Sequence, residues 1–223
     1  MKKPKEPYQR LTKFKSDLQS RLKKEFVRFT ILGFDELNVS TTKTLTKDAY
    51  TRLHKANMRD FREIAKEGRS FAYAYLTEEE KKGLSALDIS LIIALVLSTY
   101  NIVTGYKYTA EWERKRTRYA EEVLAAKEAN DRAYLTEMSK KNANLLLTQS
   151  MQAGIEIEDE AIRQVYKKAG IKWVVWVTEH DPKVCTECKL RDGKKYEIDK
   201  VPEKPHYNCR CHIKPYRGTE SQT

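Results

Sequence analysis

The sequence predicts a mainly α protein with a small C-terminal β module, an α+β arrangement in which long helices precede a short-stranded lobe. The first observation behind this prediction is the placement of proline, which is absent between Pro7 and Pro182 and occurs four times from residue 182 onward. Long proline-free stretches rich in Ala, Glu, Lys, Arg and Leu are what continuous helices require. The second observation is a β-branched and aromatic run from Ile171 to Thr178, which favours a strand buried on at least one side.

The chain is strongly basic. Its 223 residues include 43 Lys and Arg against 32 Asp and Glu, a formal net charge of +11, and residues 1–30 alone carry ten basic and three acidic side chains. A hydrophobic content of 40% excludes a wholly disordered chain, and the length suits one or two domains. No apolar segment follows Lys2 and Lys3, so no signal peptide is recognisable and an intracellular start is expected.

The first expected element is an amphipathic helix from Tyr8 to about Thr30. Its apolar residues recur at three- and four-residue steps and would form one stripe; they are Leu11, Phe14, Leu18, Leu22 and Phe26. Its basic surface can bind phosphates non-specifically, pack on an acidic protein, or remain a solvated face. The candidate contacts for double-stranded DNA or an acidic partner are Lys3, Lys5, Arg10, Lys13, Lys15, Arg21, Lys23, Lys24 and Arg28.

More helices are expected in the middle of the chain. Apolar residues on one side predict a helix from Thr44 to Tyr75, and Thr77 with Glu80 fits a capping box that opens the next helix. That next helix carries Ile89–Leu97, which is apolar on nearly every face. Only about nine residues are continuously apolar there, whereas a membrane span needs about twenty, so a buried helix without membrane contact is expected.

One very long helix is then expected from Thr109 to Gln152, ended by Gly154 as a C-terminal glycine cap. At 1.5 Å per residue it would extend roughly 65 Å, longer than a compact domain of this size is wide. Such a helix needs a partner, so we expect a homo-oligomer formed through it or a place in a larger assembly. A short helix from Glu158 to Ala169, closed by Gly170, is expected to follow.

Beyond residue 170 the pattern is that of short strands and turns. Lys194–Ile198 and Arg210–Pro215 are the two further candidate strands, and Asp192-Gly193 is a turn signal ahead of the first. The chain therefore divides into three expected regions and a tail. These are a basic helix and linker (1–42), a long-helix region (43–154), a C-terminal module (155–217) and the tail (218–223).

The C-terminal module contains all four cysteines. Cys185 and Cys188 form a CxxC pair, and Cys209 and Cys211 form a CxC pair just after His206. Zinc takes four nitrogen or sulfur ligands, and two ligand pairs separated by 15–20 residues are typical of structural sites. The expected ligands of a structural zinc ion are the four cysteines, with His206 as the substitute for one cysteine of the CxC pair. The CxC pair can share a metal only at a turn or bulge, because alternate side chains diverge in a strand.

Two disulfides, or free thiols, are the main alternative to a zinc site. Intracellular thiols stay reduced, which weighs against disulfides. A thioredoxin-like redox pair is disfavoured because a βαβ context is missing. A catalytic zinc is disfavoured because no general base is nominated beside an open position. We therefore expect a structural metal that closes a lobe with little core of its own.

The same region holds further motifs in a fixed order. They are Trp173-Val174-Val175-Trp176-Val177-Thr178-Glu179-His180-Asp181, Val184-Cys185-Thr186-Glu187-Cys188, Asp192-Gly193 and Pro205-His206-Tyr207-Asn208-Cys209-Arg210-Cys211. In order and spacing this run resembles the C-terminal domain of phage minor head proteins, the family typified by the Mu F-like head morphogenesis proteins. The resemblance covers about residues 145–215. It departs from the family pattern at Pro182-Lys183, where an Arg often follows the Asp, and at Asn208, where Pro is also common.

The resemblance implies a phage minor capsid protein, present in few copies in the virion. It implies association with the portal vertex and a role in head assembly or genome delivery, and it implies no catalysis, so an enzyme is not expected. The expected partners are the portal protein, a major capsid or scaffold protein, and packaged double-stranded DNA. The expected locations are the phage head and, during assembly, the host cytoplasm.

Two other classes of protein remain as alternatives. A zinc-containing DNA-binding regulator would need a recognition helix, and no helix-turn-helix spacing stands out. A metal-dependent nuclease is suggested by His206, Asn208 and His212 near metal-type ligands, but that arrangement would require a final helix.

Overall fold

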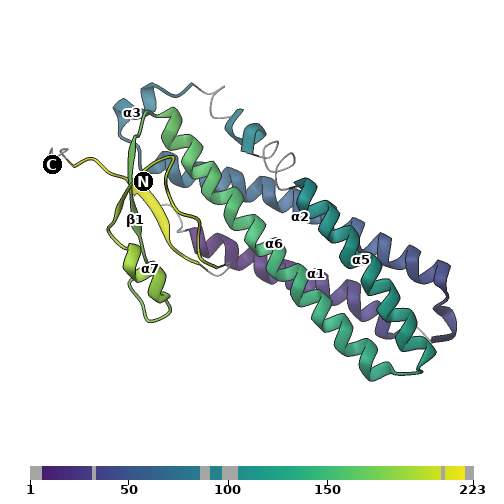
Figure 1. Ribbon diagram of the computed structural model, residues 1–223. Coiled ribbons are helices and arrows are strands. Elements are labelled where there is room, and N and C mark those ends of the chain that lie inside the picture. Colours follow the sequence, from purple (N-terminus) through teal and green to yellow (C-terminus); the bar gives the residue numbers. More distant parts are fainter. Residues whose placement is uncertain (1–6, 32–33, 86–90, 97–104, 207–208, 219–223) are drawn as a thin grey trace. The chain divides into compact units, whose positions relative to one another are not determined.

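The computed structural model describes residues 7–31, 34–85, 91–96, 105–206 and 209–218. It is mainly helical, with a small antiparallel sheet near the C-terminus, and this confirms the predicted α+β class (Figure 1). The chain forms two compact units. Unit 1 is drawn from Met1–Thr12, Phe61–Ser98 and Gln152–Thr223, and unit 2 from Lys13–Asp60 and Thr99–Met151.

Long helices make up most of both units. They are α1 (Pro7–Ile31), α2 (Val39–Ala74), α5 (Gly105–Glu128) and α6 (Arg132–Lys168), with a short 3-10 turn, η1 (Phe34–Glu36), before α2. The predicted helices at 8–30 and 44–75 are confirmed. The second begins five residues earlier than predicted because Asn38 caps it: the Asn38 Oδ1 accepts a hydrogen bond from the Thr41 backbone N–H at 2.9 Å.

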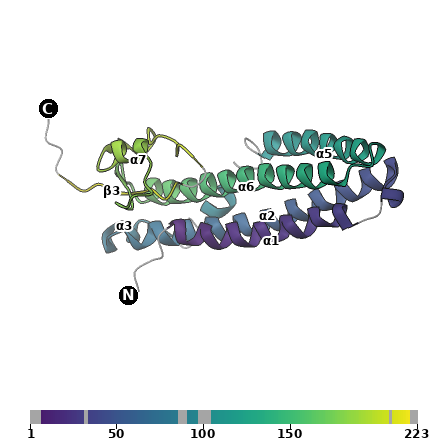
Figure 2. The ribbon, with the colours of Figure 1, turned by 90° about the horizontal axis from the view of Figure 1, so that it is seen from below.

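The single helix predicted from Thr109 to Gln152 is wrong. The chain turns between α5 and α6, and Figure 2 shows the two helices side by side. Asn130 adopts the left-handed conformation there, with φ 52°. The Asp131 Oδ1 accepts a hydrogen bond from the Tyr134 N–H at 2.8 Å and so caps the first turn of α6.

The helix end predicted at Gly154 is also wrong. Gly154 is buried inside α6, and Ala153, Ile155 and Ile157 around it are each at most 3% exposed. Tertiary packing on several sides of the helix therefore overrides the low helix propensity of glycine. The short helix predicted from 158 is the last part of α6. Gly170, with φ 76°, follows its end as predicted.

Aromatic side chains form the core of unit 2. Tyr119 of α5 packs edge-to-face against Phe26 and Phe29 of α1, with ring centroids 5.2 and 5.4 Å apart. Tyr50 of α2 packs in the same way on Trp112 at 5.6 Å. Buried hydrogen bonds then tie these rings to α6, because the Tyr50 hydroxyl bonds the Asn142 Oδ1 at 3.0 Å and the Tyr119 hydroxyl bonds the Ser139 hydroxyl at 2.7 Å.

Unit 1 includes the short helix α3 (Glu78–Lys82), which opens with the predicted capping box. The Thr77 hydroxyl accepts from the Glu80 N–H at 3.2 Å, and the Glu80 carboxylate accepts from the Thr77 N–H at 2.7 Å. The prediction that this helix continues through Ile89–Leu97 is wrong, because α3 ends at Lys82 with Gly83 as its C-cap. The segment 89–97 lies partly outside the described residues, and residues 91–96 are helical. Among the described helices, none combines the length and the apolar character that crossing a membrane requires.

The sheet of unit 1 has three strands: β1 (Trp173–Val177), β2 (Lys195–Glu197) and β3 (His212–Pro215). The strand order is β2-β1-β3, with both pairs antiparallel, so the earliest strand lies in the centre. Val174 and Trp176 of β1 are 0% and 2% exposed, and the intervening residues are half-buried. All three predicted strands are therefore confirmed, each slightly shorter than predicted.

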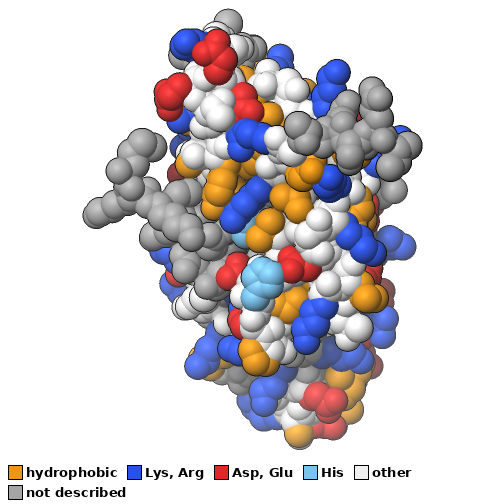
Figure 3. Space-filling view, turned by 90° about the vertical axis from the view of Figure 1, so that its left-hand side faces the viewer, with side chains coloured by type: hydrophobic (Ala, Val, Ile, Leu, Met, Phe, Trp, Pro, Cys, Tyr) orange, Lys and Arg blue, Asp and Glu red, His pale blue; other side chains and the backbone are white. Residues whose placement is uncertain are grey.

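Basic and hydrophobic side chains are intermixed on the face of the molecule shown in Figure 3. The contacts of unit 1 include the same combination. The Lys195 ammonium lies 3.9 Å from the centre of the Tyr216 ring, and the Lys214 ammonium lies 4.8 Å from that of Tyr75. These cation–π contacts let lysines of the two outer strands cover aromatic surface.

Candidate metal centre

The CxxC pair lies at the start of a short helix that follows β1. Helix α7 (Thr186–Arg191) places Cys188 in its first turn, while Cys185 is the N-cap residue and its Sγ accepts from the Cys188 N–H at 3.4 Å. The chain reaches this point through a turn at Asp181, whose Oδ1 accepts from the Lys183 N–H at 2.9 Å. Helix α7 was not predicted, because it is six residues long and its N-cap is a cysteine rather than Ser, Thr, Asp or Asn.

The CxC pair lies between a turn and β3. The Cys209 N–H donates to the His206 carbonyl at 3.0 Å, and β3 begins directly after Cys211. Because the pair lies outside the strand, both sulfurs can face the same point. No turn or bulge is assigned to Cys209–Cys211 themselves, and their sulfurs nevertheless lie within 4.8 Å of each other.

The five predicted ligands form two groups that share Cys188. The ligand atoms of Cys185, Cys188 and His206 all lie within 4.8 Å of one another, and so do those of Cys188, Cys209 and Cys211. The Cys188 and Cys209 sulfurs are 3.5 Å apart. Sulfurs bound to one tetrahedral ion at about 2.3 Å lie about 3.8 Å apart. The cysteine cluster, Cys185, Cys188, Cys209 and Cys211, could therefore hold a metal ion.

The cluster is protected from solvent and contains one acidic thiol. Cys188, Cys209 and Cys211 are 1%, 4% and 3% exposed. A hydrogen bond with Cys211, with the Lys204 ammonium nearby, lowers the pKa of the Cys209 thiol to about 6. Burial raises the pKa of Cys188 to about 12, and the hydrogen bond with Cys209 raises that of Cys211. Binding of a cation would favour the thiolate form of the sulfurs that ligate it.

An ion pair joins the two halves of the cluster. Arg210, between the CxC cysteines, donates two hydrogen bonds to the Asp181 carboxylate, and the contact to Oδ2 measures 2.6 Å. This pairing holds the pKa of Asp181 well below its usual range, at about 2. A bidentate pair fixes direction as well as distance, so the loop before Cys185 is held against the CxC turn.

Lys204 attaches the loop before His206 to helix α6. Its side chain is only 4% exposed, and its ammonium lies 2.7 Å from the Asp159 carboxylate. Arg191 of α7 adds a hydrogen bond to the Glu203 carbonyl at 2.7 Å. Sequence reasoning missed Asp181, Arg210, Lys204 and Asp159 as a supporting set, because ion pairs between distant positions leave no local periodic signal.

His212, which was considered as a further metal-type ligand, lies elsewhere. Its ring is 4% exposed and packs edge-to-face against Phe71 of α2, with centroids 5.2 Å apart. Among the described residues, no helix follows β3.

The predicted basic contacts are placed on α1 as far as the structure describes them. Lys13, Lys23, Lys24 and Arg28 are exposed, Lys15 and Arg21 are half-buried, and Arg21 is paired with Asp60. Lys3 and Lys5 lie outside the described residues, and of Arg10 only the backbone is described. At 3.6 residues per turn these exposed cations spread over roughly 140° of the helix circumference, so the basic surface of α1 is broader than one stripe.

Comparison with known proteins adds no relative. The chain matches no protein family, no curated protein and no solved structure. The cysteine cluster, its supporting contacts and the motif run that contains them are the features that bear on function.

Proposed function

We propose that this protein is a phage minor capsid protein whose C-terminal lobe is held together by a structural zinc ion. The observation that carries the proposal is the 3.5 Å distance between the Cys188 and Cys209 sulfurs. That contact joins the two separated parts of the motif run that resembles Mu F-like head morphogenesis proteins. The proposed role is that of a low-copy component at the portal vertex, acting in head assembly or genome delivery.

The donor set supports zinc over other metals. Thiolates are soft ligands that favour zinc among abundant divalent ions, whereas magnesium and calcium prefer oxygen. The three most buried cysteines leave little room for a solvent ligand, which favours a structural site over a catalytic one. The surrounding sheet has three strands of three to five residues, so bound metal would contribute much of its stability.

The zinc proposal is tested by elemental analysis of the protein purified without added metal. We expect about one zinc per chain and a lower melting temperature after treatment with EDTA. Protein that contains no zinc and melts at the same temperature with and without EDTA would contradict the proposal.

The ligand set is tested by two matched variants. Cys211→Ser should lose most of the bound zinc, because it removes one of four thiolates, whereas His206→Ala should keep about one zinc per chain. Zinc content and a cobalt-substituted absorption spectrum report the result. If His206→Ala loses zinc and Cys211→Ser keeps it, the site is a three-cysteine, one-histidine site instead.

The virion role is tested by mass spectrometry of purified particles of the phage that encodes the chain. We expect the protein in intact heads at a copy number far below that of the major capsid protein. Comparison of particles before and after genome ejection then determines whether it leaves with the DNA. Absence from both preparations would contradict a capsid role.

Helix α1 supports the proposed contact with DNA or with an acidic partner. Its exposed cations, Lys13, Lys23, Lys24 and Arg28, can pair with phosphates or carboxylates. Contact with double-stranded DNA would release counterions, so its affinity should fall steeply as salt rises. A log–log salt slope near zero would exclude phosphate contacts and leave the acidic partner.

A further inference from the structure

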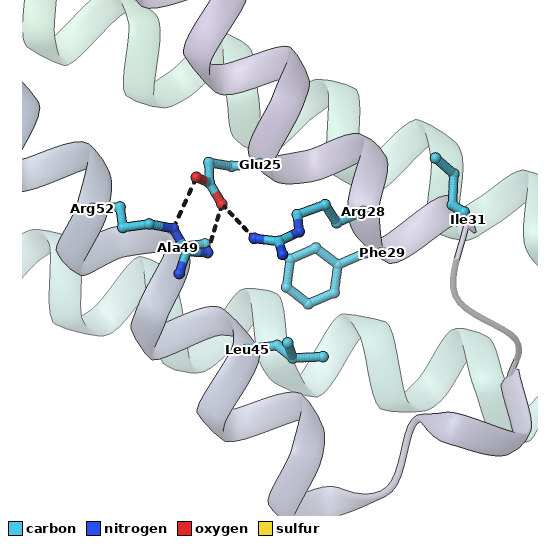
Figure 4. A pocket seen from close by; sticks show the side chains of 7 residues that line it. All are labelled: Glu25, Arg28, Phe29, Ile31, Leu45, Ala49 and Arg52. Atoms are coloured by element: carbon cyan, nitrogen blue, oxygen red, sulfur yellow. Dashed lines mark hydrogen bonds and ion pairs between the residues drawn. The ribbon is translucent and has the colours of Figure 1, made fainter.

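A pocket of about 240 Å³ opens in unit 2 between the second half of α1 and the start of α2 (Figure 4). Its apolar lining comes from Phe29, Ile31, Leu45 and Ala49, and its charged lining from Glu25, Arg28 and Arg52. Phe29 and Ala49 are almost completely buried, whereas Ile31 is 75% exposed. The pocket therefore has an apolar interior and an edge that solvent reaches.

The three charged residues are not equally paired. Arg52 donates from Nε and Nη2 to the two oxygens of Glu25, at 2.9 and 2.7 Å. Arg28 lies 3.7 Å from the same carboxylate, and its side chain is 58% exposed (Figure 4). Two arginines and one glutamate give this group a net charge of +1. Because Arg52 bonds both oxygens of Glu25, the exposed Arg28 guanidinium can bind a second anion.

We propose that this pocket is a docking site for an acidic protein segment. A large apolar side chain of the partner would enter between Phe29, Leu45 and Ala49, and a neighbouring carboxylate would pair with Arg28. The volume lies below the 300–1,000 Å³ typical of small-molecule sites and suits one side chain. Apolar anchors that fill pockets beside arginine are typical of the residues that dominate protein interfaces.

The positive charge around the pocket favours an acidic partner. Residues 13–60, which contain the pocket, carry eleven Lys and Arg against six Asp and Glu, a net charge of +5. Complementary charge accelerates encounter with an acidic surface and disfavours a basic one. DNA would satisfy the same charge, but a phosphate backbone has no apolar group to place in the pocket. A protein partner therefore uses both features, and DNA uses only one.

This inference rests on the proposed function in one respect, because it gives the chemistry of a partner within an assembly. It can be tested without the virion. The probe is the capped pentapeptide Asp-Glu-Phe-Asp-Glu, added to the ¹⁵N-labelled full chain and followed by NMR. We expect saturable shifts of amides that line the pocket, and about tenfold weaker binding when the peptide's Phe is replaced by Ser.

Matched variants separate the pocket from general attraction to a basic protein. Arg28→Ala should weaken peptide binding about five- to tenfold, because it removes the expected carboxylate partner. Lys24→Ala removes another exposed charge of α1, one that does not line the pocket, and should weaken binding less than about twofold. Ile31→Asp places a repelling charge at the exposed rim and should abolish binding without affecting folding.

Three results would overturn the inference. The first is that the peptide shows no saturable binding. The second is that Arg28→Ala and Lys24→Ala weaken peptide binding equally. The third is that Arg28→Ala weakens the binding of a 30-base-pair DNA duplex more than it weakens the binding of the peptide. Failure of the proposed function can be distinguished from failure of this inference, because a protein that is absent from virions could still bind the peptide. Conversely, a protein found in virions that binds no acidic peptide would contradict only the docking site.

Discussion

At the scale of single residues, Glu80 connects three parts of unit 1. Its carboxylate accepts hydrogen bonds from the Thr77 N–H and from Arg217, whose Nε and Nη2 lie 3.1 and 2.7 Å from the two oxygens. Arg217 also donates to the Tyr75 carbonyl at 2.7 Å. The chain beyond β3 is thus attached to the end of α2 and to the start of α3.

This contact predicts a pH dependence. The hydrogen bond from Arg217 lowers the pKa of Glu80 below its ordinary value of 4.5. A carboxylate with a depressed pKa in the folded state stabilises the fold above the unfolded pKa and loses that contribution as the pH falls through the folded value. Glu80→Gln should therefore lower stability by about 1 kcal/mol at pH 7, and the difference from the wild type should shrink towards pH 3.

Thermal unfolding at a series of pH values measures this difference. Glu79→Gln is the matched control, because Glu79 pairs with Lys82 and both side chains are largely exposed. The Glu79→Gln difference should stay small throughout. A Glu80→Gln difference that is constant between pH 7 and pH 3 would contradict the assigned role of the charge.

Residue spacing was enough to predict that the cysteines would cluster but not which residues would support the cluster. CxxC and CxC pairs keep their sulfurs close through short local segments, so Cys185, Cys188 and Cys209 could be nominated as candidate ligands from the sequence alone. The Arg210–Asp181 pair joins positions 29 residues apart. Which of many charged residues meet at such a separation depends on the path of the intervening chain, and no local pattern encodes that path.

At the scale of secondary-structure elements, α2 and α6 approach closely within unit 1 at Gly68. A Cβ atom added there would lie 2.9 Å from the Glu158 carbonyl oxygen and 3.4 Å from the Ala161 Cβ. The backbone of α6 therefore occupies the space that any larger side chain would need. Gly68 permits this contact although glycine lowers helix propensity.

Gly68→Ala should destabilise the protein by about 1–3 kcal/mol, because the helices must separate or distort to accept the methyl group. Gly83→Ala is the control: its added Cβ would make an ordinary contact at 3.7 Å, and its φ of −73° suits any residue. Urea unfolding of both variants measures the effect. Equal stability of the two variants would mean that the helices accommodate the methyl group without cost.

The turn between α5 and α6 shows why the helix pattern misled. Ala, Glu and Lys continue through residues 121–128, and only Asn130 and Asp131 interrupt them, neither of which is a strong helix breaker. The turn depends on the left-handed backbone of Asn130 and on the cap formed by Asp131. Both signals are weak alone and become decisive when Tyr119 of α5 can pack against Ser139 of α6.

The same turn provides a further prediction. Asn130→Val should destabilise the protein by about 1–2 kcal/mol, because a β-branched residue is strained at φ 52°. Asn130→Gly should be neutral or slightly stabilising, because glycine adopts this conformation freely. Thermal unfolding of the pair measures the effect, and a Val variant as stable as the Gly variant would contradict a left-handed turn at this position.

At the scale of the whole molecule, the proposed zinc ion should not stabilise all parts of the protein equally. The aromatic core of unit 2 involves no cysteine, whereas the lobe around β1–β3 has the cysteine cluster beside its sheet. Removing zinc with a chelator should therefore increase amide hydrogen exchange in residues 173–215 and leave residues 39–60 nearly unchanged. Mass spectrometry of peptides from exchanged protein measures this, and uniform loss of protection would contradict independent stabilisation.

Each unit is built from separate segments of the chain, and this sets the order in which the units can fold during synthesis on the ribosome. Unit 2 is complete once Met151 has emerged, but unit 1 requires the segment that starts at Gln152. At roughly 5–20 residues per second, the residues through Gly218 take about 3–13 s more to be made. During that interval Phe71 of α2, which is buried in the finished protein, lacks the ring of His212 that packs against it at 5.2 Å. Among the described residues of unit 1, those of the cysteine lobe are the last to emerge, and the nascent chain must keep Phe71 from aggregating until they do.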